Sequence, residues 1–453
     1  MNEEKWINKN IFYHHDLESF FKFNIPEGSS VLEIGSKTGY LINSLKPKNG
    51  VGIEFEKHLV EFATKKYRHI KFIYAKEDSI NIKGTFDYII ISDQLSKIND
   101  IQYLFNQIKN NCNENTRIII NYHSFLWLPL LDIAEKLGLK APQKRTNWLT
   151  TNDICNLLDL EGYQVIKSGS RFLFPIYIPI FSNLLNKYVG KFPVFKLFNL
   201  TNYIIARYTK NNPLEHSVSV VIAARNEKGN IENAVLRTPI MGKKTEIIFV
   251  EGGSTDGTYE EIIRIAKKYK DRNILYTKQT GIGKGDAVRK GFSIATGDIL
   301  MILDADLTVP PEDLPKFYNA INSGKGEYIN GCRLVYPMED EAMRFLNIIG
   351  NKFFSVAFSW LLDQQIKDTL CGTKVLTSEN YKKLEKNRNY FGNFDPFGDY
   401  DLIFGCAKMN LKFSEVPIRY KAREYGSTNI SRFKHGWLLM KMVVFATNKI
   451  KFI

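Results

Sequence analysis

Short apolar runs that each end in a polar turn recur along the chain. Residues 247–250 and 298–303 are nearly continuous runs of β-branched and other apolar side chains, the pattern of strands buried on both faces of a parallel sheet. In the first half, residues 30–34 and 51–54 predict two more strands, with a helix over residues 40–45 between them. We therefore predict an α/β protein with two doubly wound domains, each large enough for its own core.

A polar stretch that contains proline divides the chain. Residues 209–216 precede a new apolar strand and are predicted to form a linker between a domain at 1–208 and a domain at 217–453. The formal net charge of +14 is shared by both halves, and basic residues gather in an amphipathic C-terminal segment. Such a cluster can hold a diphosphate or rest on anionic lipid. Nucleic-acid binding is not expected, because neither half contains a recognition module.

Cysteine spacing and hydropathy indicate the cellular compartment of the protein. Five scattered cysteines without paired spacing are typical of a reducing compartment and argue against a zinc cluster. The first residues lack the profile of a signal peptide, and no spanning helix is predicted. We expect a cytoplasmic protein, and peripheral contact with the inner face of the cytoplasmic membrane is left open. Residues 172–185 are apolar but interrupted by Pro175 and Pro179, so a packed or interfacial loop is expected there.

Two further segments have an apolar face that could be buried in the protein or lie on a membrane. In residues 344–362 most polar side chains recur at a spacing of three to four, which leaves a broad apolar face that includes Phe353, Phe354 and Trp360. Residues 437–446 have the same character. Each segment is expected either to pack on a sheet or to lie at a bilayer surface.

Two acidic turns follow the apolar runs of the second half. They are Glu251-Gly-Gly-Ser-Thr-Asp-Gly-Thr258 and Asp304-Ala-Asp306. In open α/β sheets, ligands bind at the carboxyl ends of the strands. Carboxylates separated by one residue can present oxygens to one Mg²⁺ or Mn²⁺ that also bridges a substrate diphosphate. Asp304 and Asp306 are therefore the predicted metal ligands, and the cation would neutralise a departing nucleoside diphosphate.

The order of these motifs resembles the family 2 glycosyltransferases, inverting enzymes with a GT-A-type fold. The resemblance covers residues 217–437, about half of the chain, and includes the strand that ends in Asn226-Glu227, the two acidic turns and Gly283-Lys-Gly-Asp286. It implies a nucleoside-diphosphate sugar as donor. The residues to which it assigns contacts with the nucleotide sugar are Asn226, Glu227, Glu251, Asp256, Lys284, Asp304 and Arg423.

Within that family, the chain most resembles the polyprenol-phosphate sugar transferases. Their signatures are similar to Asp304-Ala-Asp-Leu-Thr-Val-Pro-Pro-Glu312, Asp368-Thr-Leu-Cys-Gly372, Glu415-Val-Pro-Ile and Arg423-Glu-Tyr-Gly. The resemblance implies a polyprenyl phosphate as acceptor, and a saccharide acceptor stays open. Departures from the family pattern occur at Glu251-Gly252, where two aspartates are usual, at Thr308, where a glutamine is common, and at Asn429, where a lysine is expected.

An inverting displacement needs a base near the acceptor oxygen unless that oxygen is already ionised. The candidate bases are Asp368, Asp399 and Asp401, and the resemblance favours Asp401. A lipid phosphate is ionised at neutral pH and needs less help. The alternative for each aspartate is a role as a surface turn residue or a helix cap.

The first half carries a second candidate site. Ser30-Val-Leu-Glu33-Ile-Gly35-Ser-Lys-Thr-Gly39 reads as a strand and a glycine-bearing turn, and the next strand ends in Glu54. An acid at that position suits the two hydroxyls of a ribose. This order, continued by runs at 86–93 and 117–121, resembles class I S-adenosylmethionine-dependent methyltransferases with a Rossmann-like fold over residues 27–208. The resemblance implies S-adenosylmethionine as cofactor, bound by Glu33, Gly35, Gly39, Glu54 and Asp78.

Two further residues of this half bear on methyl transfer. Lys37 stands where the family has its middle glycine, a place where the backbone approaches the cofactor and a side chain fits poorly. His123 follows the fifth strand and is the best candidate base, although a single histidine can also be structural.

Three functions fit the sequence. The first is a glycosyltransferase fused to a methyltransferase that modifies the same glycan or lipid product. The second keeps the glycosyltransferase and makes the first half a binding or scaffold domain. The third is a nucleotide-sugar-binding protein without catalysis, or a nucleotidyltransferase. The sequence leaves open the sugar, the nucleotide and the methyl acceptor.

Overall fold

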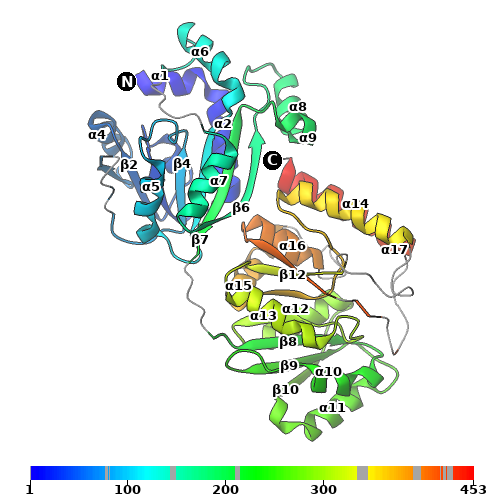
Figure 1. Ribbon diagram of the computed structural model, residues 1–453. Coiled ribbons are helices and arrows are strands. Elements are labelled where there is room, and N and C mark those ends of the chain that lie inside the picture. The colour runs from blue at the N-terminus through cyan, green and yellow to red at the C-terminus, as the bar shows by residue number, and fades with distance from the viewer. Residues whose placement is uncertain are drawn as a thin grey trace. The chain divides into compact units, whose positions relative to one another are not determined.

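The computed structural model describes residues 2–76, 80, 82–142, 149–209, 215–333, 345–390, 399–418, 420, 421, 425 and 432–452. The chain forms two compact units, Met1–Lys210 together with Lys451–Ile453, and Asn211–Ile450. Each unit contains its own sheet flanked by helices (Figure 1). The predicted α/β class is therefore confirmed.

The sheet of the first unit has the strand order β3-β2-β1-β4-β5-β7-β6. Strands β1 to β5 are parallel, and β7 pairs antiparallel with both β5 and β6. The strands are β1 (Ser30–Ile34), β2 (Asn49–Glu54), β3 (Lys71–Tyr74), β4 (Tyr88–Ser92), β5 (Arg117–His123), β6 (Tyr163–Arg171) and β7 (Thr201–Tyr208). The helices are α1 (Asn2–Lys9), α2 (Ile11–Asn24), α3 (Tyr40–Ser44), α4 (Lys57–Lys66), α5 (Ile101–Ile108), α6 (Leu128–Lys136), α7 (Thr151–Leu160), α8 (Phe181–Lys187) and α9 (Pro193–Lys196).

Successive residues of the central strands enter two different cores. Ile89 and Ile91 of β4 belong to the core beneath α5 and α7, whereas Ile90 belongs to the core beneath α2, α3 and α4. This alternation is the expected consequence of a strand whose side chains point to opposite faces. It explains why the strands read as continuous apolar runs, because both faces of the sheet are covered.

The second unit has a mixed sheet with the order β10-β9-β8-β11-β13-β12-β14. Strands β8 to β11 are parallel, and β13 is antiparallel to its neighbours β11 and β12. The strands are β8 (Val218–Ala224), β9 (Thr245–Glu251), β10 (Ile274–Lys278), β11 (Ile299–Ile302), β12 (Tyr328–Cys332), β13 (Lys374–Thr377) and β14 (Phe413–Pro417). The helices are α10 (Ile231–Arg237), α11 (Thr258–Lys268), α12 (Lys284–Ile294), α13 (Leu314–Asn322), α14 (Phe345–Leu362), α15 (Ser378–Lys386), α16 (Asp399–Lys408) and α17 (Arg432–Ala446).

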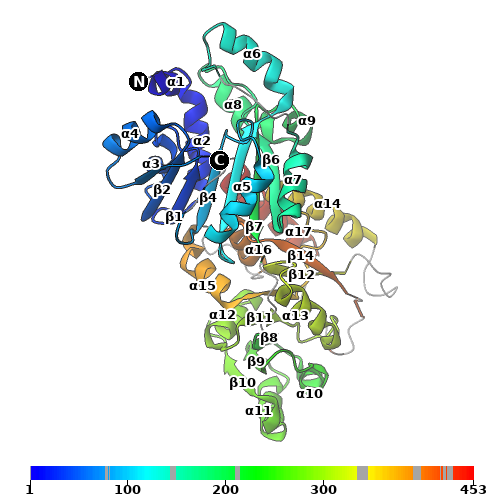
Figure 2. The same cartoon turned by 60° about the vertical axis from the view of Figure 1, so that its left-hand side comes forward.

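Both faces of this second sheet are also covered. Val220 and Ile222 of β8 share a core with residues of α10, α11 and α13, and α12 packs on the other face, where Gly291 lies against Val221 and Val250. Figure 2 shows α12 and α13 on opposite sides of β8 and β11.

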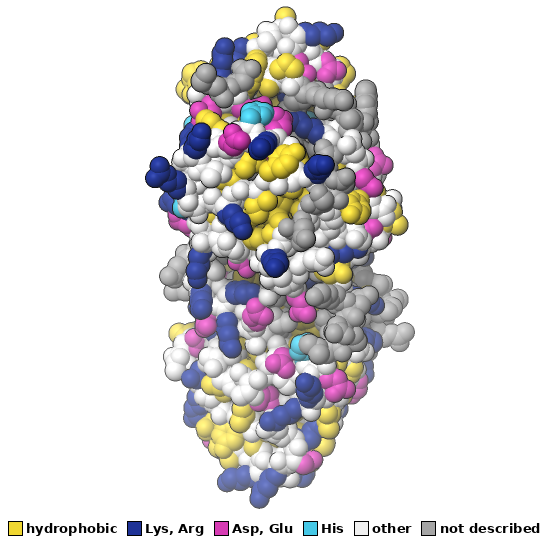
Figure 3. All heavy atoms as spheres, turned by 90° about the vertical axis from the view of Figure 1, so that its left-hand side faces the viewer, with side chains coloured by type: hydrophobic (Ala, Val, Ile, Leu, Met, Phe, Trp, Pro, Cys, Tyr) yellow, Lys and Arg dark blue, Asp and Glu magenta, His cyan; other side chains and the backbone are white. Residues whose placement is uncertain are grey.

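The surface carries basic side chains in both units, as Figure 3 shows for one face. In the part of the chain that the structure describes, no helix combines the length and the hydropathy needed to cross a bilayer.

Candidate functional site

Three turns of the second unit meet at one edge of its sheet. Strands β9 and β11 are each parallel to β8, so their carboxyl ends point the same way. The turns that follow these strands, at residues 225–230, 252–258 and 303–308, therefore lie at the edge where open α/β sheets bind ligands.

The first two of these turns are hydrogen-bonded to each other. The backbone N–H of Asn226 donates to Ser254 Oγ at 3.0 Å, and Asn226 Oδ1 accepts from the N–H of Thr255 at 2.9 Å. The N–H of Lys228 donates to Asp256 Oδ2 at 3.2 Å. Asn226 has a φ of 56°, a left-handed conformation that asparagine tolerates better than most residues. The two turns therefore form one fixed structure.

Two predicted nucleotide ligands of these turns are buried. Glu251 is 4% exposed and accepts a hydrogen bond from the N–H of Ser254. Glu227 is 8% exposed and its Oε2 accepts from Asn230 Nδ2 at 2.7 Å. Both carboxylates stabilise the turns in this structure, and their contact with a nucleotide stays a prediction.

The carboxylate of Asp256 is half-buried at the same edge. Burial alone would raise its pKa, but hydrogen bonds from the Thr258 hydroxyl and from the N–H groups of Lys228 and Thr258 lower it below the ordinary value. Asp256 is therefore ionised at neutral pH and available to accept hydrogen bonds from a ligand.

Asp304 follows β11 and pairs with a lysine from another element. Lys284 is the first residue of α12, after Gly283 with a φ of 91°, and its Nζ lies 2.6 Å from Asp304 Oδ1. Burial acts to raise the pKa of Asp304, but the positive charges of Lys284, Lys374 and Arg333 hold it below the ordinary value. The carboxylate of Asp304 is therefore ionised at neutral pH.

The segment before β13 lies directly against Asp304. A Cβ atom placed on Gly372 would overlap the carboxylate of Asp304. Lys374 is fully buried, and its Nζ donates to the carbonyl oxygen of Cys371 and to Asn330 Oδ1 at 3.5 Å. The absence of a side chain at Gly372 thus permits the close approach of this segment to the predicted metal ligand.

Asp306 is held by the residue that departs from the family pattern. Its Oδ1 accepts hydrogen bonds from the Thr308 hydroxyl at 2.8 Å and from the Thr308 N–H at 3.2 Å. Thr308 therefore orients the carboxylate. Among the described residues, no cluster of three or more His, Cys, Asp or Glu side chains has the geometry of a metal site.

Asp368 is part of a buried ion pair. Arg333 contacts it with two nitrogens, Nε at 2.7 Å from Oδ2 and an Nη at 2.8 Å from Oδ1. Burial acts to raise the pKa of Asp368, but the Arg333 charge and hydrogen bonds lower it. Glu415 Oε1 accepts from the N–H groups of Lys367 and Asp368 at 2.8 and 3.2 Å. In this structure Asp368 anchors Arg333, and its role as a base stays a prediction.

Asp401 lies on α16 between two arginines. Its Oδ2 is 3.2 Å from Arg388 Nε and 3.7 Å from an Nη of Arg289. Burial raises its pKa despite these charges. Its role as a base also stays a prediction.

Three other predicted positions cannot be placed in these sites. Asp399 begins α16, but its side chain is outside the described part of the chain. Asp78 and Arg423 lie outside the described residues altogether.

The glycine-bearing turn of the first unit follows β1. Gly35 and Gly39 have φ values of 73° and 76°, and Lys37 between them has a φ of 49°. The Lys37 N–H donates to Glu54 Oε2 at 2.6 Å. Lys37 thus occupies a conformation that favours glycine, and Glu54, the last residue of β2, fixes it there.

Glu33 and Glu54 are buried beside this turn. Burial raises the pKa of Glu33 to about 8, against the charge of Lys37 and a hydrogen bond from the N–H of Ile42. Glu54 accepts hydrogen bonds from Phe55 and Glu56 as well as from Lys37, and burial nevertheless raises its pKa.

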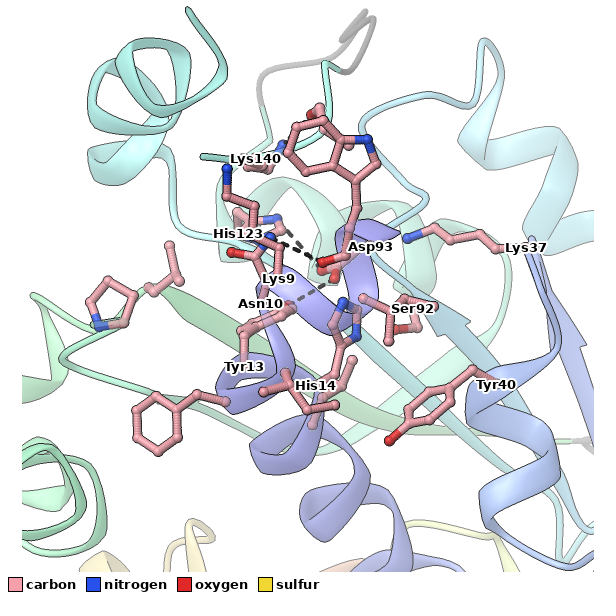
Figure 4. A pocket seen from close by; sticks show the side chains of 18 of the residues that line it. Lys9, Asn10, Tyr13, His14, Lys37, Tyr40, Ser92, Asp93, His123 and Lys140 are labelled. Atoms are coloured by element: carbon pink, nitrogen blue, oxygen red, sulfur yellow. Dashed lines mark hydrogen bonds and ion pairs between the residues drawn. The ribbon is translucent and has the colours of Figure 1, made fainter. Parts of the chain in front are cut away.

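A cavity of about 810 Å³ lies beside the turn, and Gly35, Lys37 and Asp93 line it together with residues of α1, α2 and α6 (Figure 4). Asp93, just after β4, receives a hydrogen bond from the Tyr13 hydroxyl at 2.8 Å. The Nδ1 atom of His123 is 3.6 Å from Asp93 Oδ1. The predicted base therefore lies in the cavity beside a carboxylate.

The charges in this cavity are coupled. Burial acts to raise the pKa of Asp93, but His123 and Lys37 lower it below the ordinary value. Burial, aided by Lys37, lowers the pKa of His14 to about 4. At neutral pH the cavity therefore contains an ionised aspartate and a neutral His14.

Two protein-family models match the chain over regions that contain most of these residues. Residues 9–168 match a family described as a methyltransferase domain, and residues 219–390 match glycosyl transferase family 2. The chain carries a methyltransferase domain followed by a family 2 glycosyltransferase domain. The resemblances derived from the motifs are confirmed at this level.

Relatives of the glycosyltransferase domain include a dolichol-phosphate mannosyltransferase from Pyrococcus furiosus, 33% identical over 49% of this chain and 64% of that protein. Glycosyltransferase AglJ of Haloferax volcanii is 30% identical over 43% of this chain and 60% of that protein. The chain thus spans less than two thirds of the length of these relatives.

Solved structures similar to each domain have low sequence identity. For the methyltransferase domain, a S-adenosylmethionine-dependent methyltransferase from Thermotoga maritima is 14% identical, with a TM-score of 0.37, over 46% of this chain and 95% of that one. For the glycosyltransferase domain, glucosyl-3-phosphoglycerate synthase from Mycobacterium tuberculosis, in complex with Mn²⁺, uridine diphosphate and glucosyl-3-phosphoglycerate, is 16% identical, with a TM-score of 0.37, over 52% of this chain and 80% of that one.

Several site residues were not predicted from the sequence. In the glycosyltransferase domain they are Arg333 and Lys374, whose charges act on Asp304. In the methyltransferase domain they are Tyr13 and Asp93. Asp93 had a usable signal, since it ends an apolar run at the carboxyl edge of a parallel strand, whereas Tyr13 comes from a distant helix and had none.

Proposed function

We propose that the glycosyltransferase domain transfers a sugar with inversion from a nucleoside-diphosphate sugar to a polyprenyl phosphate or glycan. The position of Asp304 carries this proposal, because the carboxylate lies at the ligand-binding edge of the sheet, 2.6 Å from Lys284 and against Gly372. The names of the relatives, a dolichol-phosphate mannosyltransferase and an undecaprenyl-phosphate 4-deoxy-4-formamido-L-arabinose transferase, favour a lipid phosphate as acceptor.

The donor set suits a divalent cation. Asp304 and Asp306 supply hard oxygen ligands, and Mg²⁺ or Mn²⁺ commonly takes one or two protein carboxylates while substrate phosphates complete its shell. When bound, the cation neutralises charge on the departing diphosphate. Lys284, which lies 2.6 Å from Asp304, could contact a phosphate oxygen of the donor, and Thr308 keeps Asp306 oriented.

The acceptor decides whether the reaction needs a base. A polyprenyl phosphate is already ionised at neutral pH and needs no base. A sugar hydroxyl would need a carboxylate, for which Asp401 remains our candidate. A lipid-phosphate acceptor also requires peripheral contact of the domain with a membrane surface.

Release of nucleoside diphosphate from a panel of nucleotide sugars in the presence of Mn²⁺ tests the proposal. We expect release with at least one donor, and loss of about 100-fold or more in Asp304→Asn and in Asp306→Asn, because each change removes an anionic ligand. Asp271→Asn, at an exposed position of the same domain, is the matched control. Undiminished turnover in both site variants, or release of pyrophosphate, would contradict the proposal.

For the methyltransferase domain we propose S-adenosylmethionine-dependent methylation of the same glycan or lipid product. The turn that lines the cavity contains Ser36, whose buried Oγ has no hydrogen-bond partner within the described structure, and Glu33 supplies a carboxyl group beneath it. These features suit a polar cofactor. S-adenosylmethionine, when bound, supplies an activated methyl group.

His123, assisted by Asp93, can accept the proton that the acceptor hydroxyl loses. Asp93 faces Nδ1 of His123 at 3.6 Å, so it orients the ring and stabilises the imidazolium that forms when His123 accepts a proton from an acceptor hydroxyl. Tyr13 and Asn121 fix Asp93 through hydrogen bonds of 2.8 and 2.9 Å.

Calorimetry with S-adenosylmethionine separates this proposal from a scaffold role. We expect saturable binding to the wild-type chain that survives in His123→Asn, because His123 serves the acceptor and not the cofactor, whereas methyl transfer should be lost in that variant. No measurable heat of binding at millimolar cofactor would leave the domain a scaffold.

A further inference from the structure

The segment between β6 and β7 of the methyltransferase domain presents large apolar side chains to solvent. Helices α8 and α9 of this segment contact the same short turn, Val189–Lys191, and lie near each other in Figure 1. We call the following side chains, each at least half exposed, the insertion face: Ile176, Tyr177, Ile180, Phe181, Leu184, Val194, Leu197 and Phe198. Soluble proteins rarely leave so many neighbouring apolar side chains uncovered without a binding role.

Helix α8 reverses the usual pattern of a surface helix, because its polar side chains are buried and its apolar side chains are exposed. Its buried side chains are Ser182 and Asn186, whereas Phe181 and Leu184 point outward. Ser182 Oγ accepts from the N–H of Ile178 and donates to the carbonyl of Ile176, both at 2.7 Å. The polar side chains thus fix the backbone from within, and the apolar ones are left for an external contact.

Backbone geometry at the outermost residue points the same way. Ile180 is 81% exposed and has a φ of 66°. A positive φ is costly for a β-branched residue and persists only where the surrounding structure imposes it. The chain therefore accepts strain at the most exposed residue of the insertion face.

The charge of the segment is suited to anionic lipid. Residues 172–200 contain no Asp or Glu but contain Lys187, Lys191 and Lys196. Lys187 is exposed and Lys196 is half-buried, so both are near the apolar face and able to meet an anionic headgroup. Aromatic and aliphatic side chains flanked by lysine are typical of segments that lie in the bilayer interface.

Helix α6 extends the apolar surface toward the cavity. The indole nitrogen of Trp127 donates to the carbonyl of Phe198 at 2.8 Å, which ties the start of α6 to the end of the insertion. Leu130 is 54% exposed and also lines the cavity. Ile176 and Tyr177 of the insertion face line the same cavity, so its wall is continuous with the exposed apolar surface.

From these observations we infer that the insertion face docks the methyltransferase domain on a bilayer that contains anionic lipid, with the cavity opening beside the acyl region. If the domain methylates as proposed above, its methyl acceptor is an amphipathic, membrane-resident molecule whose apolar part contacts Ile176, Tyr177 and Leu130. Docking is a property of the first unit and does not depend on sugar transfer by the second.

Flotation of the full-length chain with vesicles of phosphatidylcholine, with and without phosphatidylglycerol, tests the inference. We expect binding that is stronger with phosphatidylglycerol and weakened by salt. The triple variant Ile180→Asp, Val194→Asp, Leu197→Asp should lose about 100-fold or more of its partition coefficient, because three interfacial apolar contacts are replaced by charges that anionic headgroups repel. Ile180→Asp alone, at a position too exposed to affect folding, should show a smaller loss in the same direction.

The matched control replaces three exposed apolar side chains elsewhere, Leu160→Asp, Leu236→Asp and Ile240→Asp, which are 62%, 55% and 74% exposed. We expect this variant to bind vesicles like the wild type. Equal binding by both triple variants, or no vesicle binding by the wild type, would overturn the inference. A wild-type dimer that the insertion-face variant alone converts to a monomer would overturn it as well, since the face would then join two copies of the chain.

Discussion

At Gly372 the chain has no room for a side chain. The Cβ of an alanine would overlap the Asp304 carboxylate, while the backbone conformation of Gly372 places no other demand on the residue. We predict that the added methyl group of Gly372→Ala displaces the Asp304 carboxylate. Sugar transfer should then fall by about 100-fold, the effect expected when a catalytic group moves by about 1 Å. Steady-state rates of nucleoside diphosphate release measure the effect.

Gly350→Ala provides the comparison, because a Cβ at Gly350 would meet nothing within 4 Å. That variant should keep its activity, and both variants should keep the far-ultraviolet circular dichroism of the wild type. Full activity in Gly372→Ala would mean that Asp304 does not need its present position for transfer.

Single residues show where sequence patterns stop being informative. The spacing of Asp304 and Asp306 predicted their shared edge, but the cations near Asp304 come from α12, β13 and the end of β12, and no local pattern joins those elements. Lys37 was expected to fit poorly where the backbone approaches the cofactor, and that expectation stays a prediction. The structure adds that Lys37 adopts a φ of 49° and that its N–H is bound by Glu54, a contact that only the folded structure reveals.

At the scale of elements, the buried strands were the most predictable feature. The runs at 247–250 and 298–303 lie in and around β9 and β11, because strands covered on both faces need apolar residues at every position. The antiparallel strand β13 was not predicted, since it is only Lys374–Thr377 and begins with a buried lysine. Its place in the sheet depends on pairing with β11 and β12, which are distant in sequence.

Helix α8 shows a different limit. The sequence at 172–185 indicated a packed or interfacial loop, because two prolines interrupt an apolar run. In α8 the side chains of Ser182 and Asn186 are buried because they form hydrogen bonds with backbone groups of the same segment. The apolar side chains of the run are therefore left facing solvent. Hydropathy alone assigns the apolar side chains to the core and therefore gives the wrong face.

At the scale of the whole molecule, the two units have separate sheets and separate cores. Every residue of the core that contains Phe105 lies before Lys210, and every residue of the core that contains Phe249 lies after Asn211. Cooperative unfolding requires shared buried contacts, and domains with their own cores commonly unfold as distinct units. The full chain is therefore predicted to show two thermal transitions, which differential scanning calorimetry resolves.

Matched core truncations assign these transitions. Phe105 and Phe249 are both fully buried, and replacement of such a phenylalanine by alanine costs about 3–5 kcal/mol, which in a domain of this size lowers a melting temperature by roughly 10 °C. We expect Phe105→Ala to lower the melting temperature of one transition and Phe249→Ala to lower that of the other. In each variant, the melting temperature of the second transition should equal the wild-type value within error. If either variant lowers both transitions equally, the two units stabilise each other and their cores do not set stability independently.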